Sequence, residues 1–135
     1  MWRHFHHQAD IGIRGSGATL EEAFAEGAYA LMAVICNPQT VEPKEAVEIT
    51  AAVPDRELLF AEWLNQLLYE MDTRKMLFSQ FKVHIENDSL KAKAWGEPAD
   101  PIRHEPAVDV KAATYQLLSV TKQNGLWTAQ CVVDV

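Results

Sequence analysis

The feature that most constrains this chain is the shortness of the connections between its alternating apolar and polar segments. Such alternation is typical of half-buried strands. Three pairs of expected strands are joined by only two or three residues: 2–7 with 11–13, 77–86 with 90–95, and the segment before Asn124-Gly125 with the segment after it. Asn-Gly is a strong hairpin signal. Connections this short cannot cross over a sheet, so the paired strands must be antiparallel.

Two longer segments have helical spacing instead. The first opens with a capping box, in which the Thr19 hydroxyl accepts from the Glu22 amide and the Glu22 carboxylate reaches back to the Thr19 amide; Asn37-Pro38 ends it. The second starts after Asp55, the expected N-cap, and has an apolar stripe at helical spacing: Leu59, Trp63, Leu67 and Met71. A further strand, 47–53, separates the two helices.

These elements predict an α+β fold over residues 1–135. We expect a single compact domain with a mostly antiparallel sheet and two main helices packed on one face of it. Residues 96–106 contain three prolines and should be irregular. Residues 107–123 are apolar and β-rich, with room for a helical turn near Lys111.

The charge of the chain excludes some functions. Its 135 residues include 12 Lys and Arg against 19 Asp and Glu, a net charge of −7. Sequence-independent nucleic-acid binding relies on basic residues, so we expect no direct contact with nucleic acid. No apolar run approaches the roughly 20 residues of a membrane span, and residues 1–10 are polar and aromatic and lack the apolar region of a secretory signal. Cys36 and Cys131 are isolated, as buried free thiols of a cytoplasmic protein would be.

The residues that could carry chemistry are mainly carboxylates. Asp134 precedes Val135, whose α-carboxylate is the last group of the sequence, and neighbouring anions repel unless a cation lies between them. If Asp10 came near, three carboxylates would converge on a site suited to Ca²⁺ or Mg²⁺. Spacing alone does not bring Asp10 close, and a solvated terminus is the simpler interpretation. His4 and His6 share one strand face, but most strand histidines bind no metal.

Several segments taken together resemble the archease family across essentially the whole chain. The motif His7-Gln8-Ala9-Asp10-Ile11-Gly12 is similar to the family's H-T-A-D-I-G, with Gln8 in place of threonine. The other matching segments follow in the family's order: 20–24, 62–69, 96–98, 103–105, 110–115, and the penultimate Asp134.

The resemblance implies a small accessory protein, not an enzyme. It would activate the GTP- and manganese-dependent RNA ligase of tRNA splicing and RNA repair, which joins 2′,3′-cyclic-phosphate or 3′-phosphate ends to 5′-hydroxyl ends. It would promote guanylylation of the ligase and repeated turnover. The resemblance also implies a divalent-cation site, usually assigned to Ca²⁺, formed by Asp10, Asp134 and Val135, and a required lysine at Lys111. Mg²⁺ or Mn²⁺ are the alternative cations.

We take Lys111, His7, Asp72 and His104 as the candidate partner-contacting residues. For Asp72 the plainer interpretation is a turn at the end of the second helix. Two other functions stay open at this point: a metal-dependent phosphoesterase or nuclease that uses the same carboxylates, and a chaperone-like scaffold whose cation is structural. The fold does not discriminate between these functions.

Overall fold

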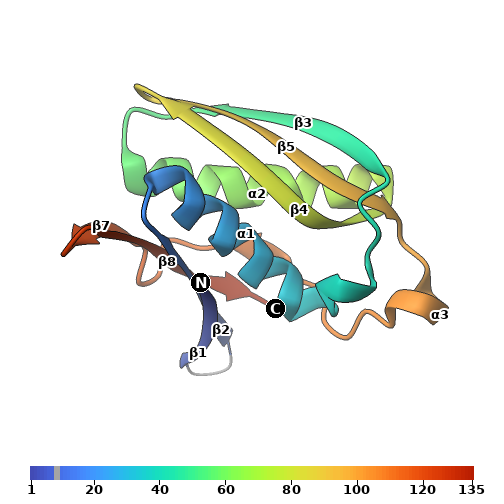
Figure 1. The fold of residues 1–135 in the computed structure, drawn as a ribbon. Coiled ribbons are helices and arrows are strands. Elements are labelled where there is room, and N and C mark those ends of the chain that lie inside the picture. The colour runs from blue at the N-terminus through green and yellow to red at the C-terminus, as the bar shows by residue number, and fades with distance from the viewer. Residues whose placement is uncertain (8–9) are drawn as a thin grey trace.

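The computed structural model describes residues 1–7 and 10–135, and its strands form two antiparallel sheets with the main helices between them (Figure 1). Gln8 and Ala9, which belong to the His7–Gly12 motif, lie outside the described residues. The α+β class with two main helices is confirmed. The strands divide into two sheets, however, so the helices are covered on two sides and do not simply cap one sheet.

The first sheet contains both ends of the chain. Its strands are β1 (Trp2–His7), β2 (Asp10–Gly17), β8 (Leu126–Asp134) and β6 (Ala112–Ala113), in that order, and β7 (Ser119–Gln123) also pairs with β8. The Asn124-Gly125 turn joins β7 to β8, and both residues have positive φ, as a hairpin turn of this kind requires. That prediction is confirmed.

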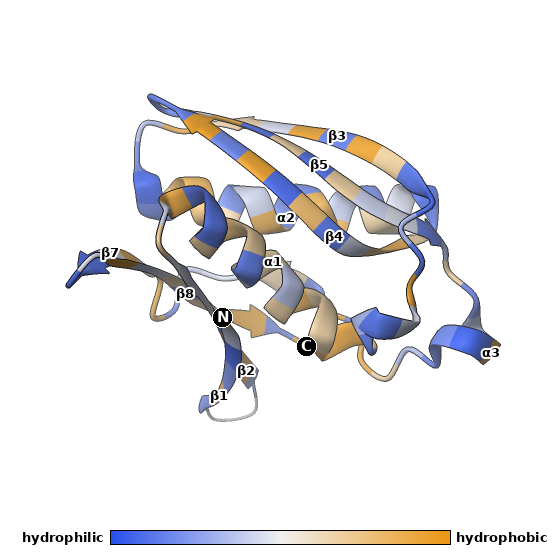
Figure 2. Ribbon diagram, viewed as in Figure 1, coloured by the Kyte–Doolittle hydropathy of each residue, from blue (hydrophilic) through white to orange (hydrophobic). Residues whose placement is uncertain are grey.

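The second sheet has the order β3-β5-β4. Its strands are β3 (Glu45–Ala52), β4 (Met76–Glu86) and β5 (Ser89–Pro98). Apolar and polar residues alternate along these strands, as Figure 2 shows, so each strand turns one side to the helices and the other to solvent. Val47, Ile49 and Ala94 are among the buried members.

The helices begin at the predicted caps. α1 (Leu20–Ile35) starts after Thr19, whose hydroxyl accepts from the Glu22 amide at 3.1 Å. The Glu22 carboxylate lies over Gly17 and accepts from the Ala18 amide, one residue before the predicted Thr19. α2 (Arg56–Arg74) starts after Asp55, whose carboxylate accepts from the Leu58 amide at 3.0 Å.

The core fills the space on both sides of the helices. α1 packs on β2 in one sheet and on β4 in the other, and α2 packs on β3 and β6. Phe24 and Phe60 meet edge to face, with ring centroids 5.0 Å apart, and the Trp63 indole donates to the Phe24 carbonyl at 3.0 Å. The apolar stripe of α2 is therefore core, which anchors the two helices to each other.

Two irregular segments differ from expectation. The prediction that 96–106 is irregular is wrong for two parts of this segment, because β5 continues to Pro98 and a short helix, α3 (Pro101–His104), follows. Strand pairing survives there because Gly96 lets the backbone of β4 approach: a Cβ at this position would lie 1.8 Å from the Leu77 carbonyl oxygen. A 3₁₀ turn, η1 (Pro38–Thr40), precedes β3, and residues 112–113 are a strand, not a helical turn.

Candidate functional site

The register of β2 and β8 brings two carboxylates to the same place. Ile11 pairs with Val133 and Ile13 with Cys131, so the next step of the same register sets Asp10 opposite Asp134. Directly opposed residues on antiparallel strands have Cβ atoms about 5 Å apart. Both aspartates are half-buried, and no salt bridge joins either carboxylate to a described side chain.

Lys111 reaches the same strand end through its backbone. Its amide donates to the Asp134 carbonyl at 2.8 Å, just before β6 pairs Ala112 with Asp134. The Asn65 side chain of α2 holds this segment: it accepts from the Ala113 amide at 2.8 Å and donates to the Ala113 carbonyl at 3.2 Å. The Asn65 side chain thus forms the pair of hydrogen bonds with Ala113 that a neighbouring strand would otherwise form, two residues after Lys111.

His7 lies on the other side of the aspartates. It is the last residue of β1 and pairs with Asp10, so the two side chains share a face of the sheet. His4 and His6, the two histidines weighed as transition-metal ligands, do not lie at this site. His4 turns to the opposite face, where its Nε2 lies 2.8 Å from the Ala30 carbonyl oxygen in α1.

The donors assembled at this sheet end suit a hard cation. Two carboxylates from adjacent strands, together with the carboxylate that follows on Val135, give oxygen ligands of the kind that Ca²⁺ and Mg²⁺ prefer. Val135 packs its side chain against the core, which holds its main chain beside Asp134. Among residues 1–7 and 10–135, no group of three or more His, Cys, Asp or Glu side chains is placed to hold a metal ion. A cation here would therefore depend on the Val135 carboxylate.

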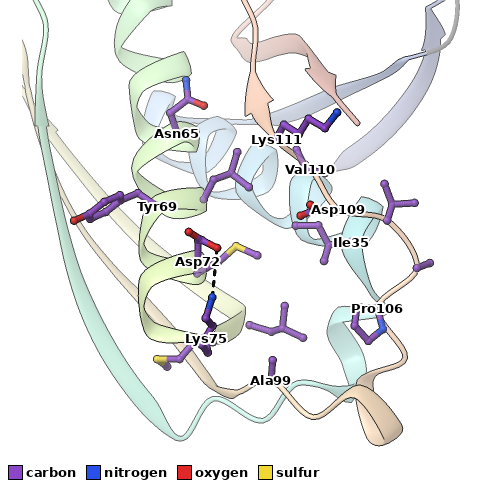
Figure 3. A pocket seen from close by; sticks show the side chains of 16 residues that line it. Ile35, Asn65, Tyr69, Asp72, Lys75, Ala99, Pro106, Asp109, Val110 and Lys111 are labelled. Atoms are coloured by element: carbon purple, nitrogen blue, oxygen red, sulfur yellow. Dashed lines mark ion pairs between the residues drawn. The ribbon is translucent and has the colours of Figure 1, made fainter.

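Asp72 lies across a hollow from Lys111 (Figure 3). The hollow has a volume of about 860 Å³ and runs between the C-terminal half of α2 and the segment 106–111. Asp72 is within α2, two residues before its end, and forms an ion pair with Lys75 at 3.6 Å. In Figure 3 the Lys111 ammonium points away from Asp72, so the two residues face the same surface without contact.

His104 belongs to a separate, buried cluster at the end of β5. Its Nε2 lies 3.0 Å from Glu97 Oε2, and its Nδ1 accepts from the Asp100 amide at 2.8 Å. Because an amide can only donate, Nδ1 carries no proton and the Nε2 proton is donated to Glu97. The His104 residue is 3% exposed, so the ring does not face a partner as expected; it supports the turn after β5.

Glu97 is the centre of this cluster. It is 2% exposed and accepts from the Glu42 amide at 2.7 Å, from the Arg103 guanidinium and from His104. These donors, the Glu42 amide foremost, lower the pKa of the Glu97 carboxyl to about 2 in spite of its burial. Glu97 in turn raises the pKa of Arg103. A buried carboxylate with this many donors stabilises the fold by holding together the segments that supply the donors.

Glu97, Arg103 and His104 all fall in the segment 96–106 that was expected to be irregular, but the sequence does not show that they lie together. The alternation of β5 gave no signal that Glu97 is buried, since it places Glu97 on the same side of the strand as the exposed Lys91 and Lys93. The approach of Asp10 to Asp134 was expected only from the family resemblance, because the spacing of residues does not show that the strands carrying them are neighbours.

Comparison with known proteins supports one family. Residues 2–135 match the model of the Archease protein family (MTH1598/TM1083). The chain is 44% identical to the protein archease of Pyrococcus furiosus, over 100% of this chain and 99% of that protein, and 45% identical to that of Pyrococcus abyssi, over 99% and 98%.

Solved structures agree with this result. Protein 1598 of Methanobacterium thermoautotrophicum has a TM-score of 0.88 and 33% identity, covering 99% of this chain and 98% of that one. An archease of Thermotoga maritima, described as a possible chaperone, shares the fold with a TM-score of 0.65 at 20% identity, covering 97% and 94%. No helix among the described residues is long and apolar enough to cross a membrane. From its family-model match and its close relatives, this chain belongs to the archease family.

Proposed function

We propose that this protein is a non-catalytic activator of the GTP- and manganese-dependent RNA ligase that joins 2′,3′-cyclic-phosphate or 3′-phosphate ends to 5′-hydroxyl ends. It would act through a divalent cation, Ca²⁺ foremost with Mg²⁺ or Mn²⁺ as alternatives, bound by Asp10, Asp134 and Val135. The observation that carries the proposal is the β2–β8 register, which sets two carboxylates from distant parts of the chain opposite each other.

The neighbourhood of these carboxylates supports a role in binding a partner. Lys111 is exposed beside Asp134, so a bound cation and the ammonium group would form one positive patch on a chain of net charge −7. Such a patch can favour one state of the ligase only if it binds that state more tightly than the other. We propose that the favoured state is the one that reacts with GTP.

The arrangement offers less support for hydrolysis. A metal-dependent phosphoesterase needs a group that activates water, and the carboxylate of the cluster around Glu97 is buried and already accepts from several donors. We further propose a cytoplasmic location. Cys36 and Cys131 are buried and free, and burial raises their thiol pKa to about 11 and about 12, so they are unreactive core residues.

The test measures multiple-turnover ligation with the ligase limiting and this protein added in substoichiometric amount. We expect wild type to raise the number of ligations per ligase, and Asp10→Ala and Asp134→Ala to lose the effect. Lys111→Gln should keep cation affinity but lose activation. Lys75→Gln is the matched control, because Lys75 lines the same hollow without approaching Asp134.

Three outcomes would redirect the proposal. If both aspartate variants activate as well as wild type, the cation has no part in activation. RNA cleavage by the purified protein with Mg²⁺ or Mn²⁺ and no ligase would indicate a hydrolase. If chelation lowers the melting temperature while turnover persists, the cation is structural, as in the chaperone-like alternative that the description of the Thermotoga maritima relative suggests.

The role of Val135 has a test of its own. Adding Gly-Ser after Val135 replaces its carboxylate by a peptide carbonyl and moves the terminal charge away. Calcium affinity should then fall, because one anionic ligand is lost. Unchanged affinity would exclude the Val135 carboxylate as a ligand and leave Asp10 and Asp134.

A further inference from the structure

The outer face of the first sheet carries a second group of polar residues, away from the aspartates. α1 and α2 both lie on the other side of this sheet (Figure 1). On the outer face the Phe5 ring lies directly over Gly12, where a Cβ would come within 2.1 Å of the ring. Val132, opposite Gly12 in β8, is fully buried yet stands apart from the main core. An aromatic and aliphatic centre thus occupies the middle of this face.

Arg14 is held in place beside that centre. Its Nε donates to Gln130 Oε1 at 2.9 Å, and its guanidinium carbon lies 5.1 Å from the centroid of the Phe5 ring. The Gln130 amide is itself anchored, since its Nε2 donates to the Leu117 carbonyl at 3.0 Å. These contacts fix the guanidinium plane and use only Nε, so both terminal nitrogens have no hydrogen-bond partner among residues 1–7 and 10–135.

A second arginine lies directly opposite. Arg3 of β1 pairs with Arg14 of β2, and like charges at opposed positions destabilise a sheet. No described carboxylate forms a salt bridge with Arg3 or Arg14, whereas Arg74 pairs with Glu70 and Arg103 with Glu97. The anchored Arg14 and the exposed Arg3 thus form a positive pair with no counter-ion among the described residues, and an anion from outside would relieve their repulsion.

We propose that Arg3 and Arg14 bind a phosphate group. One bidentate guanidinium already satisfies a carboxylate, whereas a tetrahedral phosphate has oxygens enough for two guanidinium groups and a charge near −2 to neutralise both. The site is separate from the aspartates: Arg14 lies four residues along β2 from Asp10, about 14 Å at 3.4 Å per residue. The net charge of −7 opposes phosphate binding elsewhere, so this face is a local exception. The inference does not depend on the proposed function.

The test is an NMR titration of the full chain with inorganic pyrophosphate at low ionic strength. We expect saturable shifts of the Arg14 Nε–H and Gln130 side-chain amide signals. Arg3→Gln and Arg14→Gln should each weaken binding roughly tenfold, the usual scale for a charge-assisted hydrogen bond. Arg14→Lys should weaken it similarly, because a lysine keeps the charge but loses the planar fork.

Arg56→Gln is the matched control. Arg56 also packs over an aromatic ring, that of Trp127 at 4.9 Å, and no described carboxylate pairs with it, but it has no opposed arginine. Its loss should leave the affinity unchanged. Equal weakening in Arg56→Gln, equally tight binding of succinate, or no saturable shift would each overturn the proposal.

A second probe distinguishes the source of the phosphate. A ten-residue oligouridylate with a 5′-terminal phosphate that binds at Arg3 and Arg14 more tightly than pyrophosphate would identify the phosphorylated end of a nucleic-acid strand. Tighter binding of pyrophosphate would identify a small phosphorylated ligand. If either probe binds but is insensitive to both arginine variants, the site is elsewhere and the proposal is wrong.

Discussion

Glu97 lies near one strand end and the pair Asp10–Asp134 at another, but the surroundings of these acidic groups are opposite. Glu97 is buried and receives donors from the Glu42 backbone, Arg103 and His104. Asp10 and Asp134 are half-buried and opposed to each other, and no described cation pairs with them. The fold itself supplies the donors that neutralise Glu97, whereas no described side chain neutralises Asp10 and Asp134.

This difference separates residues that maintain the fold from residues that are available to a ligand. A buried anion is tolerated only when its hydrogen bonds are made. Once they are made, the carboxylate oxygens have no free position with which to bind a ligand. Repelling carboxylates at a partly exposed edge destabilise the fold slightly and gain from a cation. Variants in one region can therefore be measured against variants in the other.

The largest effect should come from Glu97→Leu. The variant leaves the Glu42 amide and the His104 Nε2–H without their acceptor in a buried site. At 1–3 kcal/mol for each of these two groups, we expect the free energy of unfolding to fall by about 2–6 kcal/mol in urea denaturation. Arg103, 42% exposed at its side chain, can turn to water and adds little.

Glu48→Leu serves as the control for that variant, because Glu48 is an exposed residue of β3 and its change should cost less than about 0.5 kcal/mol. A loss below about 1 kcal/mol in Glu97→Leu would mean that the cluster contributes little. Glu97 would then not differ from Asp10 and Asp134 in its importance for stability.

Calcium should act only on the aspartate region. A ligand at 100 times its dissociation constant stabilises the state it binds by about 2.7 kcal/mol, so wild type should gain this amount of unfolding free energy. Asp10→Asn and Asp134→Asn should lose most of the gain, while Glu97→Gln should keep it on a lower baseline. A gain of equal size in all three variants would place the cation elsewhere.

Acid should act mainly on the Glu97 region. The folded-state pKa of Glu97 is about 2, below the ordinary 4.5, so its ionised form stabilises the fold above pH 4.5. That contribution is lost as the pH falls from 4.5 toward 2. Urea denaturation across this range should show a steeper decline in stability for wild type than for Glu97→Gln. Parallel curves would contradict the lowered pKa.

The sequence predicted local structure well and long-range neighbours poorly. Thr19 and Asp55 were identified as caps because a cap depends on the few residues that follow it. The continuation of β5 to Pro98 was missed, since it depends on Gly96 meeting the Leu77 backbone across the sheet. The Asp10–Asp134 pairing also depends on which strands become neighbours, and only the resemblance to a family suggested it.

The smallest effect is also the sharpest test of the aspartate region, because its sign should reverse with the cation. Without a divalent cation, Asp134→Asn removes the repulsion between opposed carboxylates and should raise the free energy of unfolding by about 0.5 kcal/mol, within the range of cross-strand pairs. With calcium in excess, the same variant loses a ligand and should be less stable than wild type. Urea denaturation in chelator and in calcium measures both. A variant less stable than wild type in both conditions would show that Asp134 maintains the fold as Glu97 does, and the distinction between the two regions would be lost.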